Sequence, residues 1–593
     1  MASFMMGQMT QGCASNGCGS YEEIQFRPAT TNYQYGFFAQ DNWKVTPKLT
    51  LNLGLRYDVT LPRTDRFNRQ NHFDANATSP LNSGSLTYTD PVTGQPVNLA
   101  LKGGEVFASS KQRTNYVTDW SNFQPRFGFA YQVVPNTVVR GGYGMYYGQS
   151  RSGVTGVVPY GSAGFNQFTN VITVNPNDLA TPFVNLNNPF KFGLKQPAGN
   201  SLGLLNDVGF GANGPIRTPS WNQTPYEQSW SFGIEHELPG HILINAEYIG
   251  KRGTHLPFSG SVERNFLGPW VESLPVGDFD SAAPCQAGLS IACLSSAVTN
   301  PFAGLISDPN STIGNSFPQI QYFQLLRPFP HFTGVSTEPQ LIANSIYHGL
   351  QLTAEKKYSN GLQLLATFAW SKSIDNASAA DTNVSWAGSF DSLQDPNKPE
   401  LERSLSSFDI PYVIQFSYSY DLPVGHGRAF LGNLPRWADL IIGGWKTNGI
   451  WRISDGRPLA FFLSDGGQPL PTYGAQRPDI VGTPKRNHGS DWVDNYFVDN
   501  SVFQRPAPFT LGNAPRTLGS VRSPWSFTTD LSIGKQFPIH EEMNFEFRVE
   551  AQNAFNHPVF GTPDTSVGDD TFGTISYTSV GPREIQLGFK FNF

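Results

Sequence analysis

The sequence predicts an all-β protein, a transmembrane antiparallel β-barrel of which about 13 long strands are present, with short periplasmic turns and long extracellular loops. Apolar and polar residues alternate with period two in about thirteen segments, and most of these segments are about 11 to 14 residues long. Globular strands cluster near 5–6 residues, whereas a tilted membrane-spanning strand needs roughly 9–11. The connections alternate between tight turns and very long loops, as in bacterial outer-membrane barrels.

The composition excludes several other classes of protein. Charged residues make up only 15% of the 593 residues and aromatic residues 13%, whereas soluble domains carry roughly 25% charged residues. The net charge of −6, without a Lys/Arg block, offers no surface for nucleic acid. No run of 18 or more apolar residues occurs, which excludes a helical membrane protein.

The last segment shows the alternation best, because five large apolar residues there occupy every second position. We expect strands at 34–45, 49–59, 122–133, 137–148, 227–238, 241–251, 345–358, 361–374, 408–421, 441–454, 525–537, 542–555 and 583–593. The long loops span about 60–121, 149–226, 252–344, 375–407, 455–524 and 556–582. The connection at 422–440 is an exception, since it is longer than the other turns on the short side.

Charged side chains fall on the polar phase of these strands, and in a barrel that phase faces a wet lumen. An Arg or Lys on the lipid face at mid-bilayer would cost roughly 2–4 kcal/mol. The alternative is a large soluble β-sandwich or propeller, which is disfavoured because such long apolar strand faces would promote aggregation. The predicted lumen-facing charges are Arg56, Asp58, Arg126, Glu546, Arg548 and Glu550.

The four cysteines form two local pairs, Cys13 with Cys18 and Cys285 with Cys293, both on the side of the long loops. That side is oxidising in an outer-membrane protein, so we expect two local disulfides. A zinc site that uses all four cysteines is the less favoured alternative, because its ligands would come from two loops far apart in the chain.

The sequence contains no catalytic constellation, so we expect neither an enzyme nor a cofactor. The loop around Asp391, Asp395, Asn397 and Glu400 offers oxygen ligands for a calcium ion, but it lacks an EF-hand pattern, and no metal site is predicted. The long loops are rich in Asn, Gly, Ser, Pro, Phe and Tyr. This composition suits recognition of an extracellular ligand, although solvated caps over a barrel mouth would have a similar composition.

Several segments resemble the TonB-dependent receptors of Gram-negative outer membranes, and among them the Oar-like barrels. They include YGFFAQDNWKVTPKLTLNLGLRYD at 35–58 and FRVEAQNAFNHPVFGTP at 547–563, together with 347–375, 443–459 and 581–593. The resemblance implies an outer-membrane location among lipid, and ligand uptake driven through TonB. It also implies that Phe589, Phe591 and Phe593 form the C-terminal signal for the barrel-assembly machinery.

The sequence departs from that family in ways that limit the functional expectation. No signal peptide, TonB-contacting segment or plug is visible, and a family barrel has about 22 strands. We therefore expect the C-terminal part of a longer receptor, with 1–33 an extracellular loop or remnant of a preceding barrel segment and 34–593 the barrel. Contact with the TonB complex would need a plug that this chain does not show. The alternatives are an outer-membrane structural or adhesion protein and a secreted carbohydrate-active β-protein; the ligand cannot be chosen among siderophore, glycan and peptide.

Overall fold

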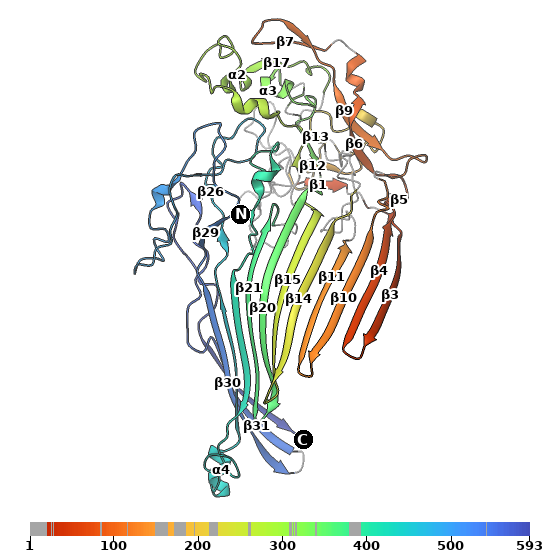
Figure 1. The fold of residues 1–593 in the computed structure, drawn as a ribbon. Helices are drawn as coiled ribbons and strands as arrows, with labels where there is room; N and C mark the ends of the chain where they lie inside the picture. Colours follow the sequence, from red (N-terminus) through yellow and green to blue (C-terminus); the bar gives the residue numbers. More distant parts are fainter. Residues whose placement is uncertain are drawn as a thin grey trace.

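The computed structural model describes residues 21–593, except 25–26, 28, 84–85, 115–116, 149–163, 171–184, 192, 195, 213–222, 259–261, 307–310, 312, 315–316, 338–340, 379–392 and 541–542. One large antiparallel sheet dominates, and thirteen of its strands lie side by side in chain order. They form a long wall with the extended connections gathered at one end (Figure 1). The strands are β3 (Gln34–Thr46), β4 (Leu49–Thr60), β10 (Phe123–Val134), β11 (Thr137–Tyr147), β14 (Tyr226–Leu238), β15 (Ile242–Leu256), β20 (Ala343–Ser359), β21 (Leu362–Asp375), β23 (Tyr412–Asp421), β24 (Trp445–Ser454), β30 (Ser526–His540), β31 (Met543–Gln552) and β33 (Glu584–Asn592), while β22 (Ser404–Leu405) pairs beside β21.

All thirteen expected strands are confirmed, but two of them begin later than the alternation predicts. The strand expected from 408 starts at Tyr412, directly after Pro411, which has no N–H to give to a sheet ladder. The strand expected from 441 starts at Trp445, because residues 436–442 form helix α4. Gly444, at φ +71°, makes the sharp change of direction between that helix and the strand.

Strand register sorts the side chains onto two faces. Leu53 lies opposite Phe127, Phe127 opposite Tyr143, and Tyr143 opposite Trp230, so these four share one face across four strands. At the other end of the sheet, Val549 lies opposite both Ile533 and Leu587 on the same phase. We call this side of the sheet the apolar face and the opposite side the polar face.

The sheet is not closed among the described residues. Strand β3 pairs only with β4, and β33 pairs only with β31, so each has one unpaired edge. Every residue of β3 is exposed. The fold is therefore a curved part of a barrel wall with two open edges.

The end of the sheet away from the long connections carries tight turns and one helix. Asn360 and Gly361, with φ of +51° and +77°, form the turn between β20 and β21. Asn-Gly pairs favour such two-residue hairpin turns, which need a positive φ at both positions. Helix α4 (Arg436–Ile442) occupies the longer connection that the sequence marks as an exception, and it lies at the bottom of Figure 1. The Lys535 ammonium, on the apolar face by register, donates to the carbonyls of Asp439 and Leu440 at 2.9 and 2.8 Å and so stabilises the end of that helix.

The long connections fold into a body of their own, which we call the cap. Its strands are β1 (Tyr21–Ile24), β2 (Thr30–Thr31), β5 (Thr64–Asp65), β6 (Asn71–Thr78), β7 (Thr87–Thr89), β8 (Pro96–Asn98), β9 (Lys102–Phe107), β12 (Gln167–Asn170), β13 (Gly211–Ala212), β16 (Val262–Glu263), β17 (Ala297–Thr299), β18 (Gln319–Gln321), β19 (Gly334–Thr337), β25 (Pro458–Leu459), β26 (Phe462–Leu463), β27 (Asp479–Ile480), β28 (Phe503–Gln504), β29 (Leu518–Arg522) and β32 (Ser566–Val567). Its helical turns are η1 (Pro80–Ser83), η2 (Gly203–Leu205), η4 (Pro269–Ser273), α2 (Ile291–Leu294), α3 (Tyr322–Leu325), η6 (Pro399–Glu402) and η7 (Asn500–Val502). No helix in the described part of the chain is long and apolar enough to span a membrane.

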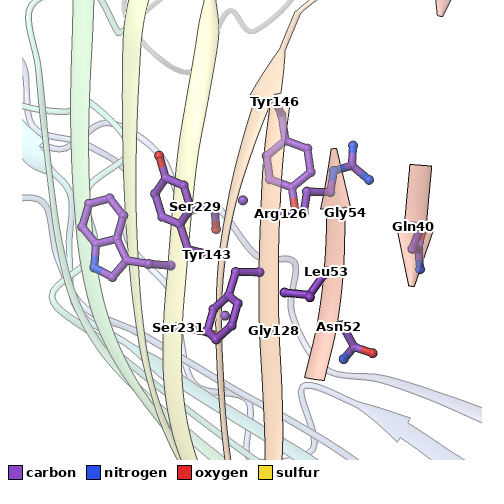
Figure 2. A pocket seen from close by; sticks show the side chains of 14 residues that line it. Gln40, Asn52, Leu53, Gly54, Arg126, Gly128, Tyr143, Tyr146, Ser229 and Ser231 are labelled. Atoms are coloured by element: carbon purple, nitrogen blue, oxygen red, sulfur yellow. The ribbon is translucent and has the colours of Figure 1, made fainter. Parts of the chain in front are cut away.

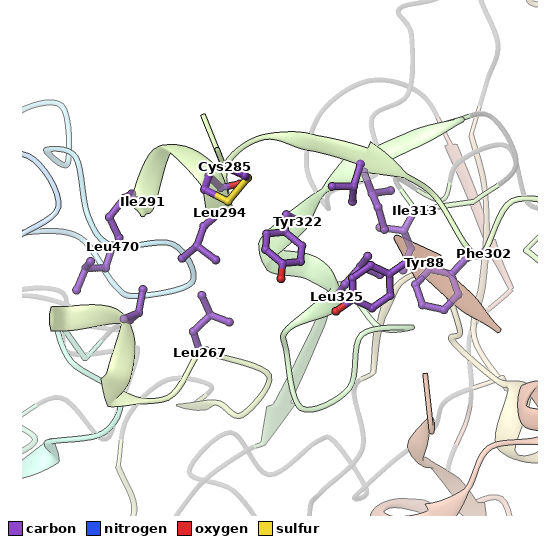
Figure 3. Packing of buried hydrophobic residues seen from close by; sticks show 14 of the residues in the cluster. Tyr88, Leu267, Cys285, Ile291, Leu294, Phe302, Ile313, Tyr322, Leu325 and Leu470 are labelled. Carbon is purple, nitrogen blue, oxygen red and sulfur yellow. A yellow bond between two sulfur atoms is a disulfide. The ribbon is translucent and has the colours of Figure 1, made fainter. Parts of the chain in front are cut away.

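Among the described residues, the buried apolar clusters lie mainly in the cap. The largest cluster brings Tyr88 and Leu101 from one connection together with Leu267, Phe302 and other residues from another (Figure 3). A second cluster packs Phe461, Phe497 and Phe503 against aromatic neighbours. Because these connections bury their apolar residues against one another, the cap is a packed body and not a set of separate solvated loops.

Candidate functional site

Charged residues on the polar face form ion pairs along and between strands. Arg56 Nε lies 2.8 Å from Asp58 Oδ2, and the Gln124 amide donates to the same carboxylate. Arg548 lies 3.1 Å from Glu546 and 3.3 Å from Glu550. The structure thus brings five of the six predicted charges into two clusters, one at each end of the strand order. Their exposure to a lumen stays a prediction.

The sixth predicted charge, Arg126, borders a hollow in the polar face (Figure 2). It lies opposite Gly54 on one neighbouring strand and Gly144 on the other, so neither residue directly opposite it has a side chain. Its guanidinium carbon stands 4.7 Å from the ring centroid of Tyr146, within the range of a cation–π contact. The ring of Tyr146 also covers Gly144, where a Cβ atom would come within 2.5 Å of the tyrosine hydroxyl.

Glycines form the floor of this hollow, which we call the glycine hollow. A second row continues the first, because Gly128 lies opposite Asn52 on one side and Gly142 on the other. Missing side chains at these positions leave a volume of about 330 Å³. Its polar rim includes Gln40, Asn52, Arg126, Ser229 and Ser231. The sequence signal that could have located the hollow is glycine at alternate positions of adjacent strands. Gly54 lies on β4, Gly128 on β10, and Gly142 and Gly144 on β11.

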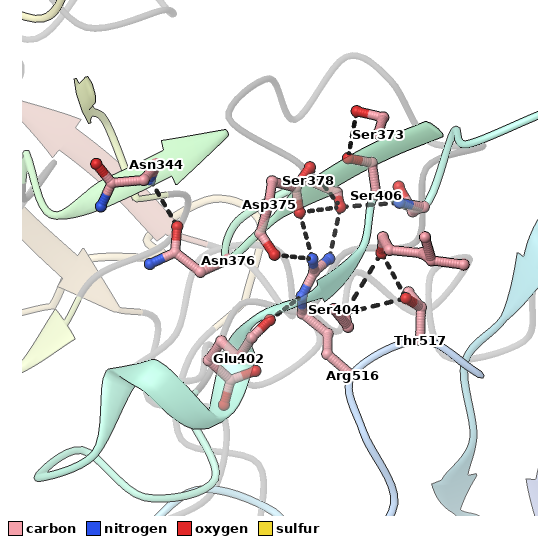
Figure 4. Close-up of polar contacts among 12 residues, drawn as sticks. Asn344, Ser373, Asp375, Asn376, Ser378, Glu402, Ser404, Ser406, Arg516 and Thr517 are labelled. Carbon is pink, nitrogen blue, oxygen red and sulfur yellow. Dashed lines mark hydrogen bonds and ion pairs between the residues drawn. The ribbon is translucent and has the colours of Figure 1, made fainter. Parts of the chain in front are cut away.

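Buried ion pairs fix the cap to the sheet (Figure 4). Arg516, 3% exposed at its side chain, pairs with Asp375, the last residue of β21. It also donates to the carbonyl oxygens of Glu402 and Asp375 at 3.0 and 3.1 Å and to Ser378 Oγ at 2.5 Å. Burial lowers the pKa of the Arg516 guanidinium, and the Asp375 and Glu402 carboxylates oppose that shift. This arginine therefore joins the β24–β30 connection to the β21–β23 connection.

Two further contacts extend this network. Arg477 pairs with the buried carboxylate of Glu402. Arg522 Nη2 lies 2.7 Å from Asp409 Oδ2, and its Nη1 donates to the Gly456 carbonyl at 3.1 Å. Charged groups this buried persist only when they are paired, so the network imposes one arrangement on the base of the cap.

Cys285 and Cys293 form a disulfide in the largest core cluster of the cap, with an S–S distance of 2.00 Å (Figure 3). Cys293 lies in α2, where Ser290 accepts a hydrogen bond from its backbone N–H. The second expected pair, Cys13 and Cys18, lies outside the described residues.

We predict that the Cys285–Cys293 bond is present in the purified protein. Reduction should raise the mass of the peptide that spans both residues by two hydrogens, and it should cost the cap about 2–3 kcal/mol, from the small loop that the bond closes. Peptide masses before and after reduction, with protease resistance of the cap, measure both effects. Unchanged masses would show free thiols and contradict the bond.

The acidic loop that offered a calcium site is occupied by hydrogen bonds and ion pairs. Asp395 Oδ1 accepts the backbone N–H of Asn397 at 2.8 Å, and Asp395 Oδ2 lies 3.2 Å from Lys398 Nζ. Glu400 is exposed, and Asp391 lies outside the described residues. No group of three His, Cys, Asp or Glu residues in the described ranges is placed to hold a metal ion.

The C-terminal aromatic residues extend the apolar face. Phe589 lies opposite Phe547, and Phe591 opposite Phe545, on the last strand pair. Phe593 follows the end of β33 and is 96% exposed. An exposed aromatic terminus on a strand with one unpaired edge is accessible to another protein, and its role as an assembly signal stays a prediction.

Comparison with known proteins gives one family model and several solved structures that are similar to the chain. The model of the family described as "Outer membrane beta barrel domain" matches residues 1–586. Among curated proteins, none matches the chain. Solved structures that resemble it include the Pseudomonas aeruginosa ferripyoverdine receptor bound to ferripyoverdine, at 9% identity and a TM-score of 0.36, covering 94% of this chain and 38% of that one. The ferric citrate transporter FecA is similar at 9% identity and a TM-score of 0.36, covering 97% of this chain and 46% of that one. The ferric-catecholate import receptor Fiu of E. coli K12 is similar at 10% identity and a TM-score of 0.34, covering 94% of this chain and 44% of that one. The chain spans less than half the length of each of these structures.

Proposed function

Because the chain belongs to the outer membrane beta barrel domain family, whose model matches residues 1–586, we propose that it forms the wall and recognition cap of an outer-membrane receptor that takes up an extracellular ligand. The apolar face contacts lipid, and the polar face lines the lumen. The cap lies outside the cell, and the chain acts by binding and passage, not by catalysis.

The packed cap is the observation that carries this proposal. A passive pore needs only short loops around an open mouth, whereas these connections bury two apolar clusters and hold charged pairs at their base. A surface fixed in this way loses little freedom when it binds a ligand, and such preorganisation favours recognition. The glycine hollow offers a polar surface on the lumen side of the wall.

The coupling to TonB is supported by the resemblance of segments such as 35–58 and 547–563 to TonB-dependent receptors. In those receptors the ligand passes when a plug moves, so uptake by this chain would need a plug. The barrel-assembly machinery would insert the wall through its C-terminal aromatic strand.

The open edges of β3 and β33 require partners in a membrane. Lipid cannot satisfy the backbone groups that an unpaired edge exposes, so barrels in membranes are closed. We therefore infer that further strands pair with both edges. The apparent mass of the native protein, detected through its last strand in outer membranes, separates the two sources of those strands. A mass well above 65.2 kDa indicates that a longer form of this chain supplies the further strands. A mass near 65.2 kDa indicates that another chain supplies them.

Uptake assays in the native cells test the proposed function. Three labelled ligands are tested separately: a siderophore, an oligosaccharide and an oligopeptide. One of them should accumulate in the cells only when the chain is present. Removal of TonB or of the proton gradient should abolish that accumulation. If accumulation survives both treatments, energised transport is contradicted.

We predict that Gly128→Leu lowers this uptake by roughly tenfold, which corresponds to about 1.4 kcal/mol of lost contact. A Cβ at this position meets only Asn52 atoms at 3.5 Å and the Gly141 carbonyl at 3.8 Å, so the new side chain enters the hollow without displacing backbone. Gly588→Leu is the matched control, because Gly588 lies on the polar face of β33, away from the hollow, and has comparable space. Equal uptake by the two variants would contradict a role for the hollow.

Adhesion is the second candidate function, favoured by large exposed aromatic side chains on the cap. Phe67, Trp120 and Tyr577 are each more than half exposed. Aromatic faces of this kind stack on sugars and peptides. Attachment of cells to a surface that depends on the chain, and that persists without TonB and without a proton gradient, would favour this function over uptake.

A further inference from the structure

The apolar face has a depression directly beneath the cap, which we call the interface depression. Its volume is about 550 Å³. The sheet contributes Tyr248, Leu350 and Trp370, which lie side by side in register on β15, β20 and β21. The cap contributes Leu405 and Pro411. The depression therefore lies where the lipid-contacting surface of the sheet meets the ordered connections.

Two cations lie on the apolar face at this level. Lys372 lines the depression, and it stands opposite His348, one row nearer the cap than Trp370. Arg252 stands opposite Ile346, one row further toward the cap. Both side chains are exposed, and within the described residues neither forms an ion pair. A charge on a lipid-facing surface is tolerated best near the membrane interface, which suits their position at the cap end of the strands.

The other charged groups of the depression already have partners. Asp409 accepts the backbone N–H of Ser373 at 2.6 Å through Oδ1 and pairs with Arg522 at 2.7 Å through Oδ2. Arg522 also donates to the carbonyls of Asp409 and Gly456. Asp409 therefore does not neutralise Lys372, and among the described residues neither Lys372 nor Arg252 has a protein counter-charge.

Aromatic rings build the wall of the depression. The Tyr248 hydroxyl lies 2.7 Å from His348 Nδ1, and the two rings stack with centroids 6.1 Å apart. Trp230 meets the same histidine edge-on at 6.2 Å. Trp370 is 61% exposed. Amphipathic rings at this depth mark the level of lipid headgroups.

We propose that the interface depression binds a phosphorylated lipid of the leaflet next to the cap. Its acyl chain lies against Leu350 and Trp370, and its phosphate lies between Lys372 and Arg252. Charge complementarity selects this occupant, because two unpaired cations stand above an apolar surface that is continuous with the lipid-contacting face. This lipid site rests on the proposed function, because it requires that the apolar face contacts lipid.

Native mass spectrometry of the full chain in detergent tests the site. The protein is mixed with equal amounts of dioleoyl phosphatidic acid and dioleoyl phosphatidylcholine, which differ only in the headgroup. Each cation near a charged lipid contributes about 1 kcal/mol, or about fivefold in binding, so two cations should favour retention of phosphatidic acid by roughly 25-fold. The variant with Arg252→Gln and Lys372→Gln should retain the two lipids about equally.

Lys251→Gln is the matched control, because Lys251 precedes Arg252 on β15 but lies on the polar face, 3.2 Å from Glu227. It should keep the preference for phosphatidic acid. A preference that survives in the double variant, or that is lost in the control, overturns the proposed site. So does complete release of phosphatidic acid by excess inorganic phosphate, since the acyl chain would then contribute nothing.

Two outcomes separate this site from the proposed function. Retention of both lipids without preference contradicts the phosphate site and leaves the barrel intact. A chain that stays in solution without detergent and retains neither lipid contradicts the lipid-contacting face, and the proposed receptor with it.

Discussion

Replacing Arg516 with methionine is expected to destabilise the base of the cap by about 3–5 kcal/mol, the cost of leaving a buried charge without its partner. The carboxylate of Asp375, 4% exposed, would lose its guanidinium, and the Glu402 carbonyl would lose a donor. Both groups lie too deep for water to replace the contact fully. The connections before β23 and after β24 should then open locally, because this arginine joins them.

The measurement is amide hydrogen exchange in detergent micelles, followed in the connections 376–411 and 455–525. Exchange should rise strongly there and remain unchanged in β14 and β15. Arg505→Met is the matched control, because Arg505 lies in the same connection and pairs with Asp465 at 2.6 Å, but both side chains are about half exposed. A surface pair of this kind contributes roughly 0–1 kcal/mol.

A double variant separates loss of the charge pair from loss of packing. With Asp375→Leu and Arg516→Met together, no buried charge is left alone, and stability should return toward that of the native chain. If the double variant is as unstable as Arg516→Met, packing and hydrogen bonds of the arginine dominate, and the buried pair is not the reason for its effect.

Placing an arginine on the apolar face at Leu352 is expected to reduce stability in a bilayer by about 2–4 kcal/mol. Leu352 stands between Ala246 and Phe368 in the register of β15, β20 and β21, well away from the cap. If this face contacts hydrocarbon, the guanidinium must leave water to reach its position. Folding of the chain into lipid vesicles, titrated with denaturant, measures the change.

Gln351→Arg is the control, since Gln351 neighbours Leu352 on the same strand but lies on the polar face. It stands opposite Glu247, so the new charge would meet a carboxylate. Near-native stability for Gln351→Arg together with a large loss for Leu352→Arg supports the assigned faces. The reverse order would mean that the polar face contacts lipid and that the lumen assignment is wrong.

The sequence by itself determined the wall. Alternation with period two is a local property, because successive side chains of a strand point to opposite faces. It therefore located all thirteen long strands and, through residues such as Leu53 and Arg126, their two faces. It misplaced two strand starts, before Tyr412 and before Trp445, where a proline and a short helix interrupt the ladder.

Local pattern could also suggest the disulfide of Cys285 and Cys293, because the two residues are close in the chain. It could not show the glycine hollow, since that depends on which glycine stands opposite which residue of the next strand. The sequence showed the charges at 56, 58, 546, 548 and 550 as lying on one face, and the tertiary structure added their pairing.

Only the tertiary structure decided that the long connections form a packed cap, that Arg516 meets Asp375 across 141 positions of the chain, and that Arg252 and Lys372 lie beneath the cap without an ion pair to any described residue. Contacts between segments so distant leave no periodic signal in either segment. Their stability comes from burial and charge pairing that exist only after the chain has folded, whereas each strand of the wall carries its own pattern of apolar and polar residues.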